Sequence, residues 1–168
     1  MKVLISDTNI LFDIIAIKAL PEFFGLDFQI CTTDFVISEI NNSEQRDQIE
    51  FFIRSRQLTI FSLTDEEIRE VELLPTTRPF KGITDKTILW KSLQLNCQLL
   101  TGDKKLRLEA IDQGLKVHGS IWVIEQMVSA EIILVPKAVE CLANLKATNP
   151  SLPHDEIDRL IEYYQDLD

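Results

Sequence analysis

Two apolar patterns alternate along the first two thirds of the chain. Short apolar runs containing β-branched residues are typical of strands buried on both faces, and they lie at 2–6, 28–31, 57–61, 97–101 and 115–118. The segments between these runs carry apolar residues at the three- and four-residue spacing of amphipathic helices. This order predicts an α/β fold, a three-layer α/β/α sandwich with a central parallel sheet of about five strands joined by right-handed crossovers.

The pattern of the last part of the chain is helical. Helices are predicted over 121–130, 137–146 and 153–164, and nothing between them resembles a linker, a repeat or low complexity. A chain of 168 residues that is 45% hydrophobic has the length for one sizeable core. We therefore expect a single domain over 1–168, in which 1–120 is the core and 121–168 is a C-terminal helical extension.

Several local signals predict where helices begin and end. One helix is expected from Ile10 to near Pro21, and another over 34–42, which reads DFVISEINN. Thr64 and Glu67 have the spacing of a capping box that opens a helix. Gly114 follows the helix after Asp103 in the position that glycine favours just beyond a helix end.

The stretch from Gly82 to Arg107 contains the least ordinary acid of the chain. Asp85 falls in the first turn of a predicted helix and begins the stripe that continues through Ile88 and Leu89. A carboxylate that begins a core-facing stripe needs a partner, and a cation is the simplest one. Asp85 is therefore a candidate metal ligand.

Three other acids lie where the predicted fold can bring them to the same place. Asp7 and Asp103 each follow a strand, so both belong at the carboxyl edge of a parallel sheet, where ligands bind in such folds. Glu39 is expected in an early turn of the predicted helix over 34–42, which can face that edge. Simpler roles remain open, because Asp7 also has the position of a helix N-cap and Glu39 that of a solvated helix residue.

The chemistry of such a cluster follows from its charge. Converging carboxylates repel one another unless cations balance them, and all-oxygen ligation without Cys or His suits Mg²⁺ or Mn²⁺. Metal-assisted hydrolysis of a phosphodiester is the reaction that such a site supports. Basic residues around the same stretch are candidates for binding the substrate phosphates, and they are Lys86, Lys104, Lys105 and Arg107.

Composition changes this interpretation only slightly. The formal charge of −10 argues against nucleic-acid binding, but half of this excess lies in the segment 155–168, while basic residues surround the central stretch. No run of about 18 uncharged apolar residues is found, and no signal peptide is recognised, so we expect a cytoplasmic protein that does not enter the membrane.

Cysteine, histidine and aromatic residues add no second site. The three cysteines lie far apart in apolar neighbourhoods and are expected to be reduced core residues. His118 and His154 have no second ligand type nearby in the sequence, so neither is expected to bind a metal. Trp90 and Trp122 are assigned to the core or an interface, and not to stacking with nucleic-acid bases.

Four short motifs give the chain a resemblance to a known family. VLISDTN, VISEI, ITDKTI and LLTGDKKL, in this order, are similar to the four acidic motifs of PIN-domain ribonucleases. The resemblance covers residues 1 to about 120 and implies a PIN-like α/β/α fold, Mg²⁺ or Mn²⁺ as cofactor and endoribonuclease activity on RNA. Many members of this family are toxins of toxin–antitoxin pairs and are often dimeric, which implies a small antitoxin protein and a homodimer as partners.

The resemblance also assigns roles to individual residues. It implies metal-binding acids at Asp7, Glu39, Asp85 and Asp103, and polar supporting neighbours at Thr8, Asn9 and Thr101. The segment VHGSIWVIEQMVSAEII is similar to the tail of an uncharacterised prokaryotic PIN-like subgroup, although Trp122 and Ala130 replace glycines of that pattern. Lys86 stands where the family commonly has alanine.

Two other functions remain as alternatives. A PIN-fold binding or scaffold protein without catalytic activity is one, and the complete set of four acids argues against it. An enzyme that accepts a phosphoryl group on Asp7 is the other, but Asn9 replaces the second acid that such enzymes carry two residues later.

Overall fold

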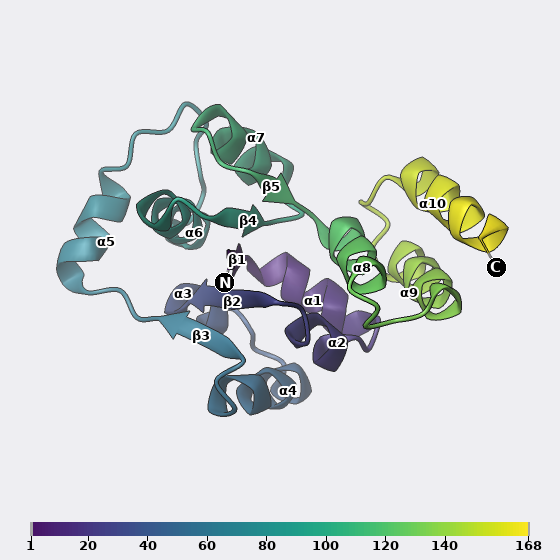
Figure 1. Ribbon diagram of the computed structural model, residues 1–168. Coiled ribbons are helices and arrows are strands. Elements are labelled where there is room, and N and C mark those ends of the chain that lie inside the picture. Colours follow the sequence, from purple (N-terminus) through teal and green to yellow (C-terminus); the bar gives the residue numbers. More distant parts are fainter. Residues whose placement is uncertain (1, 168) are drawn as a thin grey trace.

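Five parallel strands form one sheet within residues 2–167, the part of the chain that the computed structural model describes (Figure 1). The strands are β1 (Lys2–Ser6), β2 (Phe28–Thr33), β3 (Leu58–Phe61), β4 (Gln98–Leu100) and β5 (Val117–His118). Their order is β3-β2-β1-β4-β5, with all four pairings parallel. The side chains of Leu4, Ile5, Leu99 and Leu100 are fully buried, as expected for central strands covered on both faces.

Helices cover both faces of this sheet, so the predicted three-layer α/β/α fold is confirmed. In Figure 1, α1 and α2 lie on one side of the strands, and α6 and α7 lie on the other. The helices that follow β1, β2 and β3 are α1 (Thr8–Ala16), α2 (Leu20–Phe24), α3 (Asp34–Ser38), α4 (Ser43–Arg54), α5 (Asp65–Glu72) and α6 (Ile83–Leu95). The remaining helices are α7 (Lys104–Asp112), α8 (Ser120–Ser129), α9 (Val135–Thr148) and α10 (His154–Asp166).

The first predicted helix is divided into two. The chain leaves α1 at Ala16 and takes a left-handed conformation at Lys18, with φ 56°, before α2 begins. Pro21 therefore lies in the first turn of α2 and does not end the earlier helix. Proline is accepted in a first turn because the missing N–H has no partner there in any case.

The helix predicted over 34–42 is shorter than expected. It ends at Ser38, and Glu39 is its C-cap, so Glu39 does not lie in an early turn. Asn42 instead caps the next helix, where its side chain accepts a hydrogen bond of 3.0 Å from the amide of Gln45. A side chain that caps a new helix competes with continuation of the old one.

Other local predictions are confirmed. The Thr64–Glu67 capping box is present at α5, with both reciprocal hydrogen bonds formed. Gly114 follows α7 with a φ of +90°, a conformation that a residue with a Cβ adopts only under strain. Cys31, Cys97 and Cys141 are all free, and no helix among residues 2–167 is long and apolar enough to cross a membrane.

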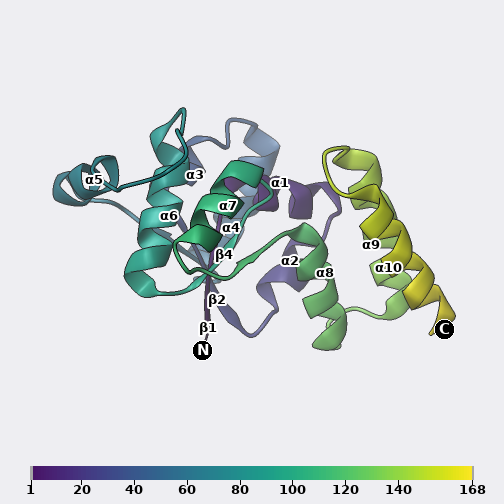
Figure 2. The ribbon, with the colours of Figure 1, turned by 90° about the horizontal axis from the view of Figure 1, so that it is seen from above.

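The C-terminal helices pack against the start of the chain. In Figure 2, α8, α9 and α10 lie together at the side of the molecule where α1 and α2 are found. Buried Asp13 of α1 joins them, because its carboxylate accepts hydrogen bonds from Ser120 Oγ at 2.6 Å and from Asn149 Nδ2 at 2.9 Å. Burial raises the pKa of Asp13, and these two donors act in the opposite direction.

We expect Asp13→Ala to loosen α8 and α9 from the core. The hydroxyl of Ser120, which is 1% exposed, would lose its acceptor, and an unsatisfied buried group costs about 1–3 kcal/mol. Chemical denaturation should show that loss, and hydrogen exchange should increase first in α9. Asp13→Asn keeps an acceptor oxygen and serves as the control. Equal destabilisation by both variants would contradict the assigned role of the acceptor.

Candidate functional site

The order of the strands places a crevice at the carboxyl ends of β1 and β4. From β1 the chain continues to β2 and β3 on one side of β1, and β4 and β5 lie on its other side. The strand order therefore reverses direction between β1 and β4. Such a switch point is where open parallel sheets bind ligands. Asp7 directly follows β1, and Asp103 follows β4 after two residues.

Asp7 and Asp103 have the same local structure. Each caps the helix that follows it: Asp7 Oδ1 accepts from the amide of Ile10 at 3.2 Å, and Asp103 Oδ1 accepts from the amide of Leu106 at 2.8 Å. Acids favour this position because their oxygens satisfy the free amides of the first helical turn. For Asp7, the N-cap role proposed from the sequence is therefore confirmed. Capping by Oδ1 leaves Oδ2 of each carboxylate available for other contacts.

Thr101 links these two acids. Its hydroxyl donates to Asp7 Oδ2 and accepts a hydrogen bond of 3.0 Å from the backbone amide of Asp103. Thr101 is fully buried and Asp7 is 3% exposed, so this polar contact lies inside the protein. The contact holds the ends of β1 and β4 in a fixed relation and orients the Asp7 carboxylate.

Asp85 lies in the first turn of α6, as predicted. The helix start is held to the end of β2 by the hydroxyls of Thr33 and Thr87, which are 3.0 Å apart. Within residues 2–167, no hydrogen bond reaches the carboxylate of Asp85, although its side chain is partly buried. A carboxylate in this situation has lost water without gaining a donor, which is unfavourable unless a cation joins it.

Glu39 reaches the same region from the end of α3. Its Oε2 accepts a hydrogen bond of 2.8 Å from Thr8 Oγ1, the hydroxyl of the residue next to Asp7. Thr8 is buried, and this hydrogen bond connects the exposed Glu39 to the start of α1. Asn9, the other predicted supporting residue, is exposed, and its Cβ lies 4.0 Å from where a Cβ on Gly102 would stand.

Burial and nearby negative charge both disfavour the ionised form of two of these acids. Burial raises the pKa of Asp7 to about 7, with a further contribution from the charge of Asp85, against hydrogen bonds from Thr101 and Ile10 that lower it. Burial also raises the pKa of Asp85 to about 6, and the charges of Asp103 and Glu39 add to this effect. Asp85 thus interacts with each of the other three acids.

The predicted phosphate-binding residues occupy different places. Lys105 lies near the acids, since its charge lowers the pKa of Asp85, and its Nζ donates to the carbonyl of Pro79 at 2.9 Å. Arg107 donates to the carbonyl of Thr101 at 3.4 Å, and Lys104 is exposed beside Asp103. Lys86 donates instead to the carbonyl of Glu72 at 3.0 Å, a bond that it would have to break to bind a phosphate.

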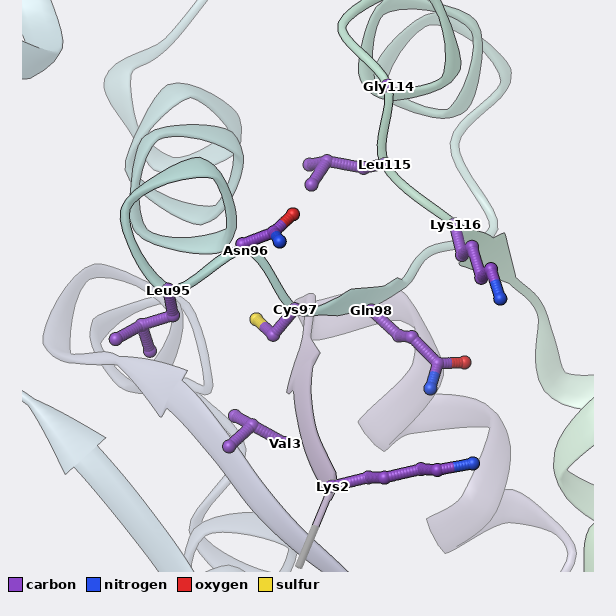
Figure 3. A pocket seen from close by; sticks show the side chains of 9 residues that line it. All are labelled: Lys2, Val3, Leu95, Asn96, Cys97, Gln98, Gly114, Leu115 and Lys116. Atoms are coloured by element: carbon purple, nitrogen blue, oxygen red, sulfur yellow. The ribbon is translucent and has the colours of Figure 1, made fainter.

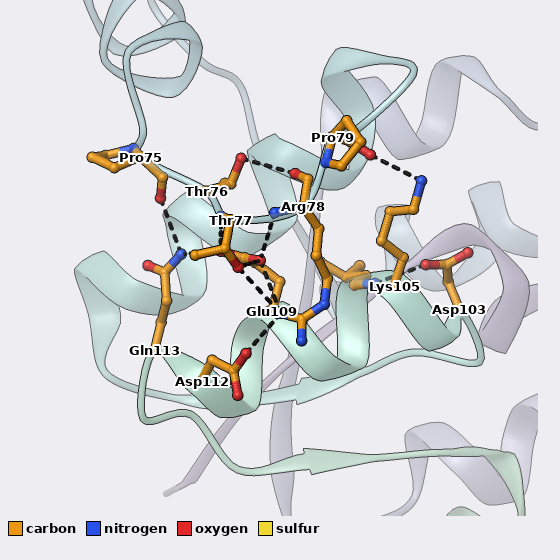
Figure 4. Close-up of polar contacts among 11 residues, drawn as sticks. Pro75, Thr76, Thr77, Arg78, Pro79, Asp103, Lys105, Glu109, Asp112 and Gln113 are labelled. Atoms are coloured by element: carbon orange, nitrogen blue, oxygen red, sulfur yellow. Dashed lines mark hydrogen bonds and ion pairs between the residues drawn. The ribbon is translucent and has the colours of Figure 1, made fainter.

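Glu109 is a structural residue of the site that the sequence did not reveal. It is 1% exposed in α7. Its carboxylate accepts hydrogen bonds from the backbone amides of Thr77 and Arg78, the hydroxyl of Thr77, the guanidinium of Arg78 and the side-chain amide of Gln113 (Figure 4). Burial alone would raise the pKa of Glu109, but these donors lower it to about 2. Glu109 therefore fixes the loop that leads into α6 and Asp85. Only its position on the buried face of a predicted helix could have indicated it.

The residues present suit a divalent cation of the Mg²⁺ type. The four carboxylates provide only oxygen donors, and burial together with neighbouring negative charge raises the pKa values of Asp7 and Asp85, which a bound cation would oppose. In the part of the chain that the structure describes, no three His, Cys, Asp or Glu side chains are grouped closely enough to enclose a metal ion. Mg²⁺ usually keeps several waters and is bound directly by only one or two carboxylates, so a loose cluster of acids suits it.

A cavity of about 520 Å³ at the other end of the sheet is separate from these acids (Figure 3). It is lined by the start of β1 and by the residues that precede β4 and β5, among them Lys2, Cys97 and Lys116. These are the amino ends of the strands, and none of the four predicted acids lines the cavity. The candidate site is therefore confined to the carboxyl edge.

The match to a protein-family model agrees with the sequence motifs. A family model described as PIN domain matches residues 3–165. Among solved structures, the chain is similar to a PilT N-terminus domain protein from the hyperthermophilic archaeon Sulfolobus solfataricus P2, with 13% identity, a TM-score of 0.49, and coverage of 76% of this chain and 92% of that one. It is also similar to a domain of a functionally unknown protein from Methanocaldococcus jannaschii DSM 2661, with 18% identity, a TM-score of 0.49, and coverage of 71% and 91%. No curated protein matches the chain.

Proposed function

Because the chain belongs to the PIN-domain family, whose fold is typically that of a nuclease, we propose that it is a metal-dependent endoribonuclease that hydrolyses RNA phosphodiester bonds. The observation that carries this proposal is the arrangement of the acids at one edge of the sheet: Thr101 joins Asp7 to Asp103, and Thr8, next to Asp7, bonds Glu39. The negative charges of Glu39 and Asp103 act on Asp85 at the same edge. Mutual repulsion among these acids is balanced most simply by the cation that phosphodiester hydrolysis needs.

The four acids would hold Mg²⁺ or Mn²⁺, which when bound supplies a Lewis acid and lowers the pKa of a bound water. The chain's own residues orient the reactants. Thr101 and Ile10 fix the carboxylate of Asp7, and Thr8 fixes that of Glu39. Lys105 lies beside Asp85 and is suited to contact a phosphate of the substrate, although its amine must first leave the carbonyl of Pro79.

The proposal predicts that purified protein cleaves a mixed single-stranded RNA in Mn²⁺ or Mg²⁺ and that EDTA stops the cleavage. Gel electrophoresis of end-labelled RNA provides the measurement. Metal should also raise the melting temperature of the protein, because an ion that binds only the folded state stabilises it. Metal-dependent stabilisation without cleavage would favour the alternative of a catalytically silent PIN-fold binding protein. Cleavage that persists undiminished in EDTA would contradict the proposal.

The finer biological role is also part of the proposal. We propose a cytoplasmic toxin that forms a homodimer and is held inactive by a small antitoxin protein, a role implied by the family motifs. Co-purification with the product of a small adjacent gene and size-exclusion chromatography test the two partners. Loss of RNA cleavage upon addition of that protein is the expected result.

A further inference from the structure

A second cavity, of about 410 Å³, opens beside the candidate acids. Its walls come from the start of α7, from β5 and α8, and from the connection between α9 and α10. Gly102 and Lys104, the two neighbours of Asp103 in the chain, line it. A molecule in this cavity would therefore lie next to the proposed metal site. Its volume is within the range of about 300–1,000 Å³ that small-molecule sites occupy.

The wall nearest Asp103 is positively charged. Lys104 and Arg107 line the cavity there, and Arg107 extends across Gly119. A Cβ on Gly119 would stand 3.1 Å from the guanidinium nitrogen of Arg107, so any larger residue would displace this side chain. The cavity thus has a defined place for an anionic group such as phosphate.

Two aromatic rings also line the cavity. The rings of His118 and Trp122 stack with their centroids 3.9 Å apart and an angle of 8° between planes. The Nε2 atom of His118 lies 2.7 Å from Gln98 Oε1, which holds the stack in place. Trp122 is partly exposed, whereas Trp90 is buried, with only 6% of its surface exposed. Trp122 packs against the hydrophobic core, as the sequence predicted, and it also lines this cavity.

Two acidic residues line the cavity as well. They are Glu125 of α8 and Glu156 of α10. Burial raises the pKa of Glu125, and the negative charge of Glu156 adds to this effect. Carboxylates accept hydrogen bonds and repel phosphate. A ligand that matches this lining therefore has an anionic group for the basic residues, a flat ring for the aromatic pair and N–H donors for the carboxylates.

We propose that this cavity binds the base of one RNA nucleotide adjacent to the bond that is cut, with its phosphate at Lys104 and Arg107. Unpaired bases are recognised in this way, by stacking and by hydrogen bonds to their edges. Guanine is the preferred base, because its adjacent N1–H and N2–H groups can both donate to one carboxylate. Uracil has a single N–H between two carbonyls and is disfavoured. The inference rests on the proposed ribonuclease function for its substrate class.

The test uses binding of nucleoside 5′-monophosphates in EDTA, so that cleavage plays no part. In a Trp90→Phe protein, Trp122 is the only tryptophan, and its fluorescence reports on the cavity. We expect saturable quenching by GMP, binding of UMP about tenfold weaker, which corresponds to about 1.4 kcal/mol, and no quenching by inorganic phosphate. Calorimetric titration of the unmodified protein with GMP and UMP gives the same comparison if Trp90→Phe does not fold.

Two variants complete the test. Glu125→Gln should remove the preference for GMP over UMP, while Lys116→Ala, which changes an exposed residue lining only the cavity at the amino ends of the strands, should keep it. Equal binding of GMP, UMP and inorganic phosphate, or no binding of any of them, would overturn the proposal. GMP binding that depends on Glu125 in a protein without RNA cleavage would retain the cavity assignment and reject the ribonuclease function. RNA cleavage by a protein that binds GMP and UMP equally would retain the ribonuclease function and reject the cavity assignment.

Discussion

Replacing Asp85 by asparagine is expected to abolish most metal-dependent RNA cleavage, by a factor of about 100 or more, because loss of even an outer-shell partner of a metal costs about 10–100-fold. Asp85 has no hydrogen bond to lose within residues 2–167, and asparagine has nearly the same shape, so the fold should persist. Cleavage rates in Mn²⁺ provide the measurement. The melting temperature of Asp85→Asn in EDTA should equal or exceed that of the wild type, since a repelling charge is removed.

A matched control separates the site from a general effect on helix starts. Asp65 is likewise an acid in the first turn of a helix, but it is exposed on α5. Asp65→Asn loses a similar favourable interaction with the helix dipole, about 0.3–1 kcal/mol, and should cleave RNA at the wild-type rate. If wild type, Asp85→Asn and Asp65→Asn cleave RNA equally, Asp85 is not a metal ligand.

The largest loss of stability is expected from Glu109→Ala. Removing this buried carboxylate leaves the amides of Thr77 and Arg78 without their acceptor, while the guanidinium of Arg78 keeps its contact with Asp112. A hydrogen bond to a charged group contributes roughly 1.5–3 kcal/mol, and the bonds of both amides are lost together. For a protein of this size each kcal/mol lowers the melting temperature by about 2–4 °C, so a decrease on the order of 10 °C should be seen in thermal unfolding.

The pH dependence of this effect has a defined sign. The pKa of Glu109 is lowered to about 2 in the folded protein, so its contribution is fully present above the ordinary value of 4.5 and is lost as the pH falls toward 2. The difference in stability between wild type and Glu109→Ala should therefore shrink between pH 5 and pH 2, as chemical denaturation would measure.

Asp112→Ala is the control for Glu109→Ala. Asp112 also contacts Arg78, at 2.7 Å, but its side chain is 55% exposed. An exposed ion pair contributes only about 0–1 kcal/mol. Equal losses of stability in Asp112→Ala and Glu109→Ala would show that burial of the Glu109 carboxylate is not what anchors the loop before α6.

Local patterns in the sequence were sufficient for the layers of the fold and for part of the site. Buried strands and amphipathic helices differ in their apolar period, so their alternation predicted a parallel sheet covered on both faces. The places of Asp7 and Asp103 followed from the same pattern, because both acids lie within two or three residues of a strand end. Asp85 was predicted from its position at the start of a helix stripe.

Other features depend on contacts between distant residues and were decided only by the tertiary structure. Glu109 and Thr77 are 32 residues apart, and Asp13 and Asn149 are 136 apart, so no local pattern joins them. The end of α3 at Ser38 placed Glu39 at a helix end, where Thr8 binds it.

The sequence by itself therefore determined which elements form and which acids stand at their ends. The spacing of apolar residues and the capping of helices each depend on only a few neighbouring residues. Only the tertiary structure decided which side chains meet. It joined Lys86 to α5 and placed Trp122 in a cavity beside Asp103. Packing of one element's face against another controls such meetings, and that packing depends on the whole chain.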